Sequence, residues 1–171
     1  MEHDLLAAKR RRYLAEIIDL FPDGEPRLDL LCEATAQLLD CQHASINMIT
    51  DKKLFAIGAY NVPVRELELV RERPFDDYGL TEFRCVTDEH RKALYLDRQG
   101  FDLGYAVRVP FMVDGVSLGG FFVGGAEPRV DGLSTEQMAG LKAAAELAAQ
   151  ILKRSERIRT QLRGLIGLLV T

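Results

Sequence analysis

The chain of 171 residues is long enough for one domain with its own core, and short for two. Hydrophobic residues make up 47% and charged residues 28%, a composition that excludes a disordered chain. The net charge of -4 and the lack of a long apolar stretch favour neither nucleic acid nor a membrane as partner. Three cysteines without CxxC spacing favour a reducing compartment, so we expect a soluble cytoplasmic protein.

Two helices are predicted at the start of the chain. In the N-terminal unit, residues 1–24, apolar residues recur at helical spacing around a basic run, 9–12, which we interpret as a solvated face. A second helix begins near Pro26 and continues to Asp40. Its buried stripe is expected to comprise Leu28, Leu31, Cys32, Thr35, Leu38 and Leu39.

Extended segments follow the second helix. They are predicted at residues 44–50, 54–60, 93–96, 105–113 and 116–124. A turn at Asp51-Lys52-Lys53 makes the first two a hairpin, and Asp114-Gly115 predicts a tight type I′ turn between the last two. Pro110 indicates an edge or bulge position within its strand, because proline cannot donate to a neighbouring strand.

A long irregular segment and a closing helix complete the pattern. Residues 61–92 are charged and punctuated by proline and glycine, so loops with one short helix are expected there. Loops of this length in a compact domain are often functional. Ser134 and Gln137 fit a capping box at the start of a helix that runs to about Arg163.

This order of elements predicts an α+β fold. One antiparallel sheet has the terminal helices packed on one face and loops covering the other. The α+β core occupies 25–128, and 133–171 completes the domain and extends as a dimerisation or signalling helix. A sheet face roofed by loops is a natural place for a small-molecule pocket.

Several strings in the sequence resemble GAF domains. Val109 to Gly115, with Leu118-Gly119-Gly120-Phe121 and Val123, resembles their paired strands, and Pro26 to Asp51 resembles their opening helix and first strand. Leu133 to Gln137 resembles the start of their closing helix, so the similarity covers about 25–152. It implies a GAF/PAS-like sensory or regulatory module, of the kind found beside histidine kinases and diguanylate cyclases, with a downstream kinase or cyclase as partner.

The resemblance implies a small-molecule ligand without identifying it, so the cofactor is unknown. The residue set of cyclic-nucleotide-binding GAF domains is absent, and Cys85 is followed by Val86 rather than by the histidine of bilin-binding ones. Two alternatives stay open. One is a ligand-free dimerisation module, and the other is a thiol redox enzyme resembling free methionine sulfoxide reductase, with Cys85 as nucleophile. Because Cys85 lacks a nearby resolving cysteine, a non-enzymatic module is the leading interpretation.

Candidate pocket residues are mostly aromatic, although aromatic residues more often simply pack in a core. Arg108 interrupts an apolar strand and suits a carboxylate or phosphate, but a solvent-facing edge position or an ion pair with an acid such as Glu82 is the simpler interpretation. The full candidate set is Tyr60, Phe75, Tyr78, Phe83, Cys85, Tyr105 and Arg108. No metal site is expected, because the metal-capable side chains within residues 85–90 do not have the spacing of metal ligands.

The last helix carries an apolar stripe that continues past the reach of the sheet. Its members are Leu147, Ile151, Ile158, Leu162, Leu165 and Leu169. A matching stripe on the first helix comprises Leu6, Tyr13, Ile17 and Leu20. We therefore predict a parallel homodimer held by a bundle of four helices from two chains.

Overall fold

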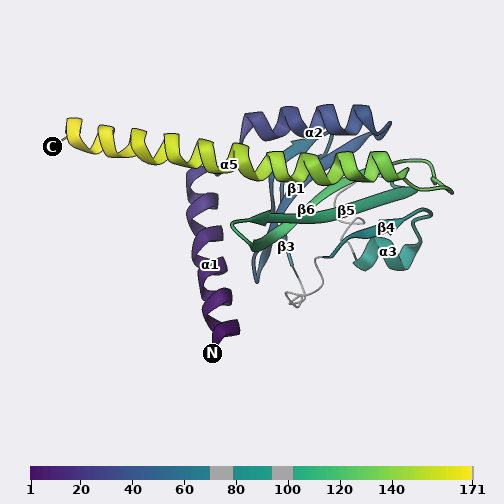
Figure 1. The fold of residues 1–171 in the computed structure, drawn as a ribbon, viewed down its shortest axis with the longest axis horizontal. Coiled ribbons are helices and arrows are strands. Elements are labelled where there is room, and N and C mark those ends of the chain that lie inside the picture. Colours follow the sequence, from purple (N-terminus) through teal and green to yellow (C-terminus); the bar gives the residue numbers. More distant parts are fainter. Residues whose placement is uncertain (70–78, 94–101, 171) are drawn as a thin grey trace.

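The computed structural model describes residues 1–69, 79–93 and 102–170 (Figure 1). Its helices are α1 (Glu2–Leu20), α2 (Pro26–Leu38), α3 (Asp88–Ala93) and α5 (Thr135–Val170). Its strands are β1 (His43–Ile49), β2 (Lys53–Tyr60), β3 (Glu66–Glu68), β4 (Thr81–Phe83), β5 (Tyr105–Val113) and β6 (Val116–Gly125). The strands form one antiparallel sheet in the order β3-β2-β1-β6-β5-β4, which confirms the predicted α+β class.

The hairpin turns form where the sequence places them. Asp114 and Gly115 have φ values of 50° and 75°, as a type I′ turn requires, and they join Val113 directly to Val116. Pro110 lies past the end of β4, in the part of β5 that is paired with β6 next to an irregularity at Phe111 and Met112. Its predicted edge position is therefore confirmed.

The segment 61–92 contains more regular structure than its sequence indicates. β3 and β4 are three-residue strands that extend the sheet at its two edges, and both were missed because such short strands have no readable alternation. The strand expected at 93–96 is wrong at Ala93, which ends α3. The remainder of that prediction, 94–96, lies outside the described residues.

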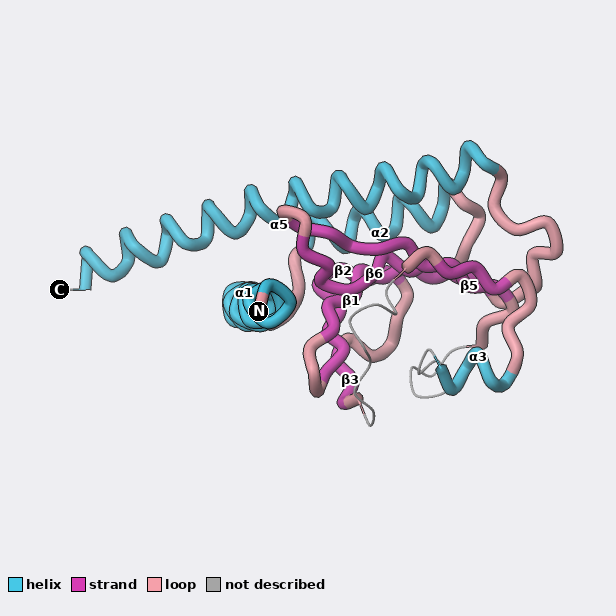
Figure 2. The backbone as a smooth tube through the Cα atoms, turned by 60° about the horizontal axis from the view of Figure 1, so that its bottom comes forward, coloured by secondary structure: helices cyan, strands magenta, loops and turns pink. Residues whose placement is uncertain are grey.

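α2 and α5 run side by side on one face of the sheet, and α3 lies on the other (Figures 1 and 2). The α2 stripe is buried as predicted at Leu28, Cys32, Thr35 and Leu39. Leu31 is only partly buried against the core, and Leu38 is the exception, since 82% of it is exposed. It faces the flank of α5 rather than the sheet, and the small residues of that flank do not cover it.

α1 closes one end of this core through an unexpected residue. Arg10 is only 2% exposed, so the basic run is not a fully solvated face. Its Nε donates to the Ser117 carbonyl at 2.8 Å, and its terminal nitrogen donates to the carbonyls of Ile49 and Leu118. The guanidinium thus satisfies backbone acceptors at the ends of β1 and of the β5–β6 hairpin.

The apolar stripe of α1 is used inside its own domain. Ile17 and Leu20 are buried in the main core, and Tyr13 donates a 2.9 Å hydrogen bond to Glu156 of α5. Burial and this carboxylate raise the pKa of Tyr13. α1 therefore does not offer the stripe that the predicted four-helix bundle requires, and that part of the prediction is wrong.

α5 begins with the predicted capping box. The Ser134 amide donates to Gln137 Oε1 at 2.9 Å, and the Gln137 amide donates to Ser134 Oγ at 3.1 Å. The helix ends at Val170 rather than near Arg163, because neither Gly164 nor Gly167 interrupts it. Among the described helices, none combines the length and apolar character needed to cross a membrane.

Candidate functional site

The two faces of the sheet differ in chemistry. Every second residue of β1 joins the main core under the helices, namely Ala44, Ile46 and Met48. Ser45 and Asn47 alternate with them and therefore point to the opposite face. Arg108 of β5 lies on that opposite face as well, because its neighbours Val107 and Val109 belong to the core. We call Ser45, Asn47 and Arg108 the polar floor.

Strand register brings the three residues together. Ser45 and Arg108 are both paired with Phe122 of β6, from its two sides, and Asn47 is paired with the next floor position, Gly120. A Cβ atom on Gly120 would lie 2.5 Å from Arg108 Cδ, so the stem of Arg108 lies over this glycine. The side chain of Arg108 thus extends over the strand that separates it from Asn47.

The polar floor is buried although its groups are polar. Ser45 is 1% exposed, and Asn47 and Arg108 are each 9% exposed. Within the described part of the chain, Ser45 Oγ has no hydrogen-bond partner. Arg108 is therefore not the solvent-facing edge residue of the simpler interpretation. Glu82 accepts hydrogen bonds from Tyr105, Arg84 and the Leu133 amide.

An apolar rim borders the polar floor on the side of β4. Leu103, Ala106 and Phe122 form a buried cluster, with Phe83 and Val86 packed against it. His90 of α3 stacks on Phe83, with the ring centroids 3.9 Å apart. α3 is thereby held against the same face of the sheet as the polar floor, so this face has a partly apolar roof.

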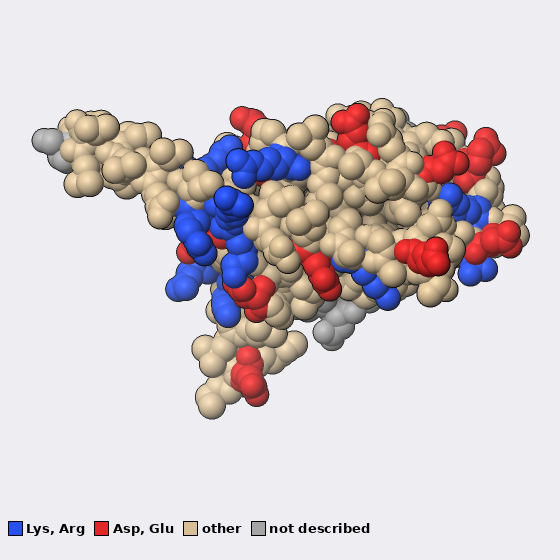
Figure 3. Space-filling view, turned by 45° about the horizontal axis from the view of Figure 1, so that its top comes forward, with Lys and Arg blue, Asp and Glu red and all other residues tan. Residues whose placement is uncertain are grey.

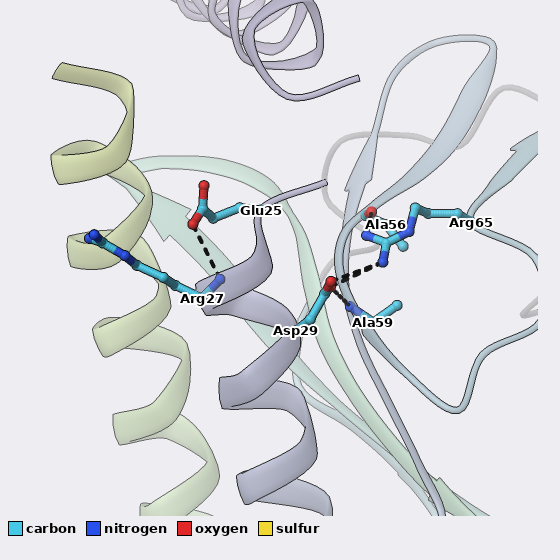
Figure 4. A network of polar contacts seen from close by, with 6 residues as sticks. All are labelled: Glu25, Arg27, Asp29, Ala56, Ala59 and Arg65. Atoms are coloured by element: carbon cyan, nitrogen blue, oxygen red, sulfur yellow. Dashed lines mark hydrogen bonds and ion pairs between the residues drawn. The ribbon is translucent and has the colours of Figure 1, made fainter. Parts of the chain in front are cut away.

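Two ion pairs lie along the part of the chain between β2 and β5. Arg65 Nη2 donates to both carboxylate oxygens of Asp29 in α2 at 3.1 Å, and Arg65 Nη1 donates to the Ala56 carbonyl, while Asp29 accepts the Ala59 amide (Figure 4). At the other end, Arg91 of α3 pairs with Asp102 at 2.8 Å. The first contact joins the chain after β2 to α2, and the second joins α3 to the residue before Leu103 and β5.

Two of the predicted pocket aromatics lie on the helix face instead. Tyr60 is half-buried against the main core, and Tyr105 is fully buried in it. Burial and the 2.7 Å hydrogen bond to Glu82 raise the pKa of Tyr105. Tyr105 lines a separate pocket of ≈ 230 Å³ with Cys41 and Arg129, away from the polar floor.

The structure therefore divides the predicted site residues. Phe83 and Arg108 share the floor face, whereas Tyr60 and Tyr105 do not. Cys85 is exposed in the turn after β4, and Phe75 and Tyr78 lie outside the described residues. Sequence reasoning missed Ser45 and Asn47, although their alternation with apolar residues in β1 is the pattern that marks a second face.

The other cysteines are poor candidates for redox chemistry. Burial raises the pKa of the Cys32 thiol to about 12, and burial also raises that of Cys41 despite the nearby Arg129. Both thiols are buried, so neither is positioned as an accessible partner for Cys85. Within the described ranges, no group of three or more histidine, cysteine or acidic side chains is arranged to hold a metal ion.

Comparisons with known proteins give structural matches only. No protein-family model matches the sequence, and no curated protein matches it. The GAF domain of PixJ from Thermosynechococcus elongatus, in its blue-light-absorbing form, is similar with a TM-score of 0.60 and 16% identity. That match covers 90% of this chain and 95% of the PixJ domain.

Two further matches have different functions. The GAF domain of the Acinetobacter phosphoenolpyruvate-protein phosphotransferase has a TM-score of 0.58 and 11% identity, over 88% of this chain and 96% of that one. The type II free methionine-R-sulfoxide reductase of Thermoplasma acidophilum has a TM-score of 0.55 and 12% identity, over 79% and 96%. The chain has the GAF fold, as its sequence predicted, and at these identities the fold is all that the matches show.

Proposed function

We propose that this chain is a cytoplasmic GAF-type sensory or regulatory module of signal transduction, which binds a small molecule on the polar floor and acts as a helix-mediated dimer. The observation that carries the proposal is the buried set of Ser45, Asn47 and Arg108 on the sheet face opposite α2 and α5. A sheet face covered only for stability would bury apolar side chains, because a buried polar group without a hydrogen-bond partner, such as Ser45 Oγ among the described residues, costs free energy.

The chemistry of the polar floor favours an anionic ligand. A guanidinium matches the geometry of a carboxylate or phosphate group, and an amide and a hydroxyl add neutral hydrogen bonds. The apolar rim around Phe83 and Phe122 would hold the remainder of the molecule. Such a mixture, apolar walls with a few convergent polar groups, is typical of small-molecule pockets.

The helices supply the output in this proposal. From Ile158 onward, α5 projects past the sheet with its apolar residues exposed (Figure 1). Exposed apolar surface of this extent favours association with another helix. A kinase or cyclase is the class of downstream partner that the sequence resemblance implies.

A thiol redox enzyme is the competing function, since its fold class matches and Cys85 is exposed. A reductase of that kind needs a second accessible thiol to resolve the oxidised cysteine. Cys32 and Cys41 are buried, so neither supplies this second accessible thiol. We therefore favour a binding module.

Native mass spectrometry of the purified protein, with Ser45→Ala and Arg108→Gln as variants, tests the ligand. We expect the wild-type chain to carry a small molecule that both variants lose. Thermal shift with small carboxylates and phosphate monoesters is expected to stabilise only the wild type. If the wild-type protein carries no small molecule and no compound raises its melting temperature, a ligand-free dimerisation module would be favoured instead.

A further inference from the structure

Two apolar surfaces of the helix layer are left uncovered. The first, the α2–α5 groove, is an open groove of ≈ 430 Å³ lined by both helices, including Leu31, Leu38, Gly140, Ala144 and Leu147. The second, the tail, is the part of α5 from Ile158 to Val170. The tail is free of charge beyond Arg163, and Figure 3 shows this far end without charged residues, with Lys and Arg gathered where α1 meets α5.

The two surfaces lie on one side of α5. Residues of α5 on the groove side, Gly140, Ala144, Leu147 and Ile151, are spaced by 4, 3 and 4 positions. The tail repeats this spacing at Ile158, Leu162, Leu165 and Leu169, and all four are exposed. Each tail residue follows its groove counterpart by 18 positions, which is five turns at 3.6 residues per turn. The tail stripe is thus the direct continuation of the groove side.

Side-chain size decides how two such helices fit. In a parallel pair each residue would face its own copy, so Gly140 would face Gly140, Ala144 would face Ala144, and these small residues would leave the groove unfilled. The 4, 3, 4 spacing reads the same from either end, so in an antiparallel pair the tail residues of one helix match the groove-side residues of the other. Leu162 then faces Leu147, Leu165 faces Ala144 and Leu169 faces Gly140. Large residues fill the space beside small ones, as close packing requires.

We propose that the partner on these surfaces is a second copy of the chain, with the tail of each protomer seated in the α2–α5 groove of the other. The two α5 helices run antiparallel, and the two-fold axis passes between Arg154 and Ser155. This inference rests on the helix-mediated dimer of the proposed function and replaces the parallel arrangement expected from the sequence.

α1 leaves this side of α5 open. Arg159 donates to the Leu20 carbonyl at 2.6 Å, and Arg163 pairs with Asp19 at 2.9 Å. Arg159 follows the buried Leu141 by 18 positions, so α1 meets the tail on the side that faces the sheet. A partner helix on the groove side therefore does not collide with α1.

Cross-linking between variants that have one exposed cysteine each, with Cys32 and Cys41 left buried, tests the orientation. In a Cys85→Ser background, Leu147→Cys and Leu162→Cys proteins are mixed and treated with a short bismaleimide. We expect a covalent dimer in the mixture and none from either variant alone, with Thr160→Cys, on the far side of the tail, as the unreactive control. Self-cross-linking of Leu162→Cys alone would overturn the antiparallel arrangement while leaving the dimer intact.

Two matched substitutions on α2 test the groove. Leu38 lines the groove and Leu30 does not, although both are exposed. By light scattering, Leu38→Glu is expected to raise the dimer dissociation constant at least about tenfold, equal to about 1.4 kcal/mol, and Leu30→Glu to leave it unchanged. An unchanged Leu38→Glu dimer would overturn the groove assignment. A monomeric wild type at micromolar concentration would overturn the dimer of the proposed function as well.

Discussion

Replacing Ser45 with alanine removes a buried hydroxyl that has no hydrogen-bond partner in the described part of the structure. Burying such a group costs roughly 1 to 3 kcal/mol in mutational data. Ser45→Ala should therefore stabilise the folded state by about that amount. Since 1 kcal/mol shifts the melting temperature by roughly 2 to 4 °C for a chain of this size, the expected rise is about 2 to 12 °C.

The assay is thermal unfolding of wild type and variant, each first unfolded and refolded to remove small molecules. Ser155→Ala is the matched control, because Ser155 Oγ is also buried without a partner but lies on α5, away from the polar floor. Both variants should melt higher than wild type, and only Ser45→Ala should lose ligand binding. If Ser45→Ala melts lower than wild type, the hydroxyl is a structural group and the reasoning fails.

Three further outcomes are expected. Free methionine sulfoxide with a thioredoxin system should leave NADPH consumption at background, and turnover abolished by Cys85→Ser would contradict the binding module. In hydrogen exchange, amides of 79–92 should exchange faster than those of 105–123 and slow when ligand binds, since this segment buries little apolar surface; equal protection without ligand would count against this. Burial raises the pKa of Glu82, but hydrogen bonds from Leu133, Tyr105 and Arg84 outweigh it and lower the pKa overall. Its stabilising effect is complete above the unfolded value of about 4.3 and disappears as pH falls through the lower folded value. The melting-temperature advantage of wild type over Glu82→Gln should therefore shrink as pH falls from about 5 to about 3, and a constant difference would refute this role.

Local signals in the sequence were sufficient for much of the fold. The capping box at Ser134 and Gln137 and the type I′ turn at Asp114-Gly115 both depend on a few adjacent residues, and both form as predicted. Helix and strand positions followed from hydrophobic periodicity for the same reason. The edge strands β3 and β4 were missed because three residues carry no period.

The candidate site was harder to predict because it depends on contacts between distant segments. Arg10 is buried by acceptors that lie more than a hundred positions away at Ser117 and Leu118, so its local basic run indicated solvent instead. Arg108 lies over Gly120, a neighbour created by strand pairing and not by sequence proximity. Tyr105 was placed in the pocket with Arg108 because it is aromatic, although residues three apart in a strand lie on opposite faces, and the structure buries Tyr105 in the main core.

β1 itself provides the strongest comparison for the polar floor. Its helix-facing residues, Ala44, Ile46 and Met48, are apolar and buried, as expected where packing alone determines the residue type. Ser45 and Asn47 come from the same strand and are buried to a similar degree, so position in the fold does not account for their polarity. Valine or isoleucine would suit a covered strand better on both propensity and desolvation grounds. Burying Ser45 and Asn47 therefore has a cost that the opposite face of the same strand avoids, and the polar ligand of the proposed function would account for it.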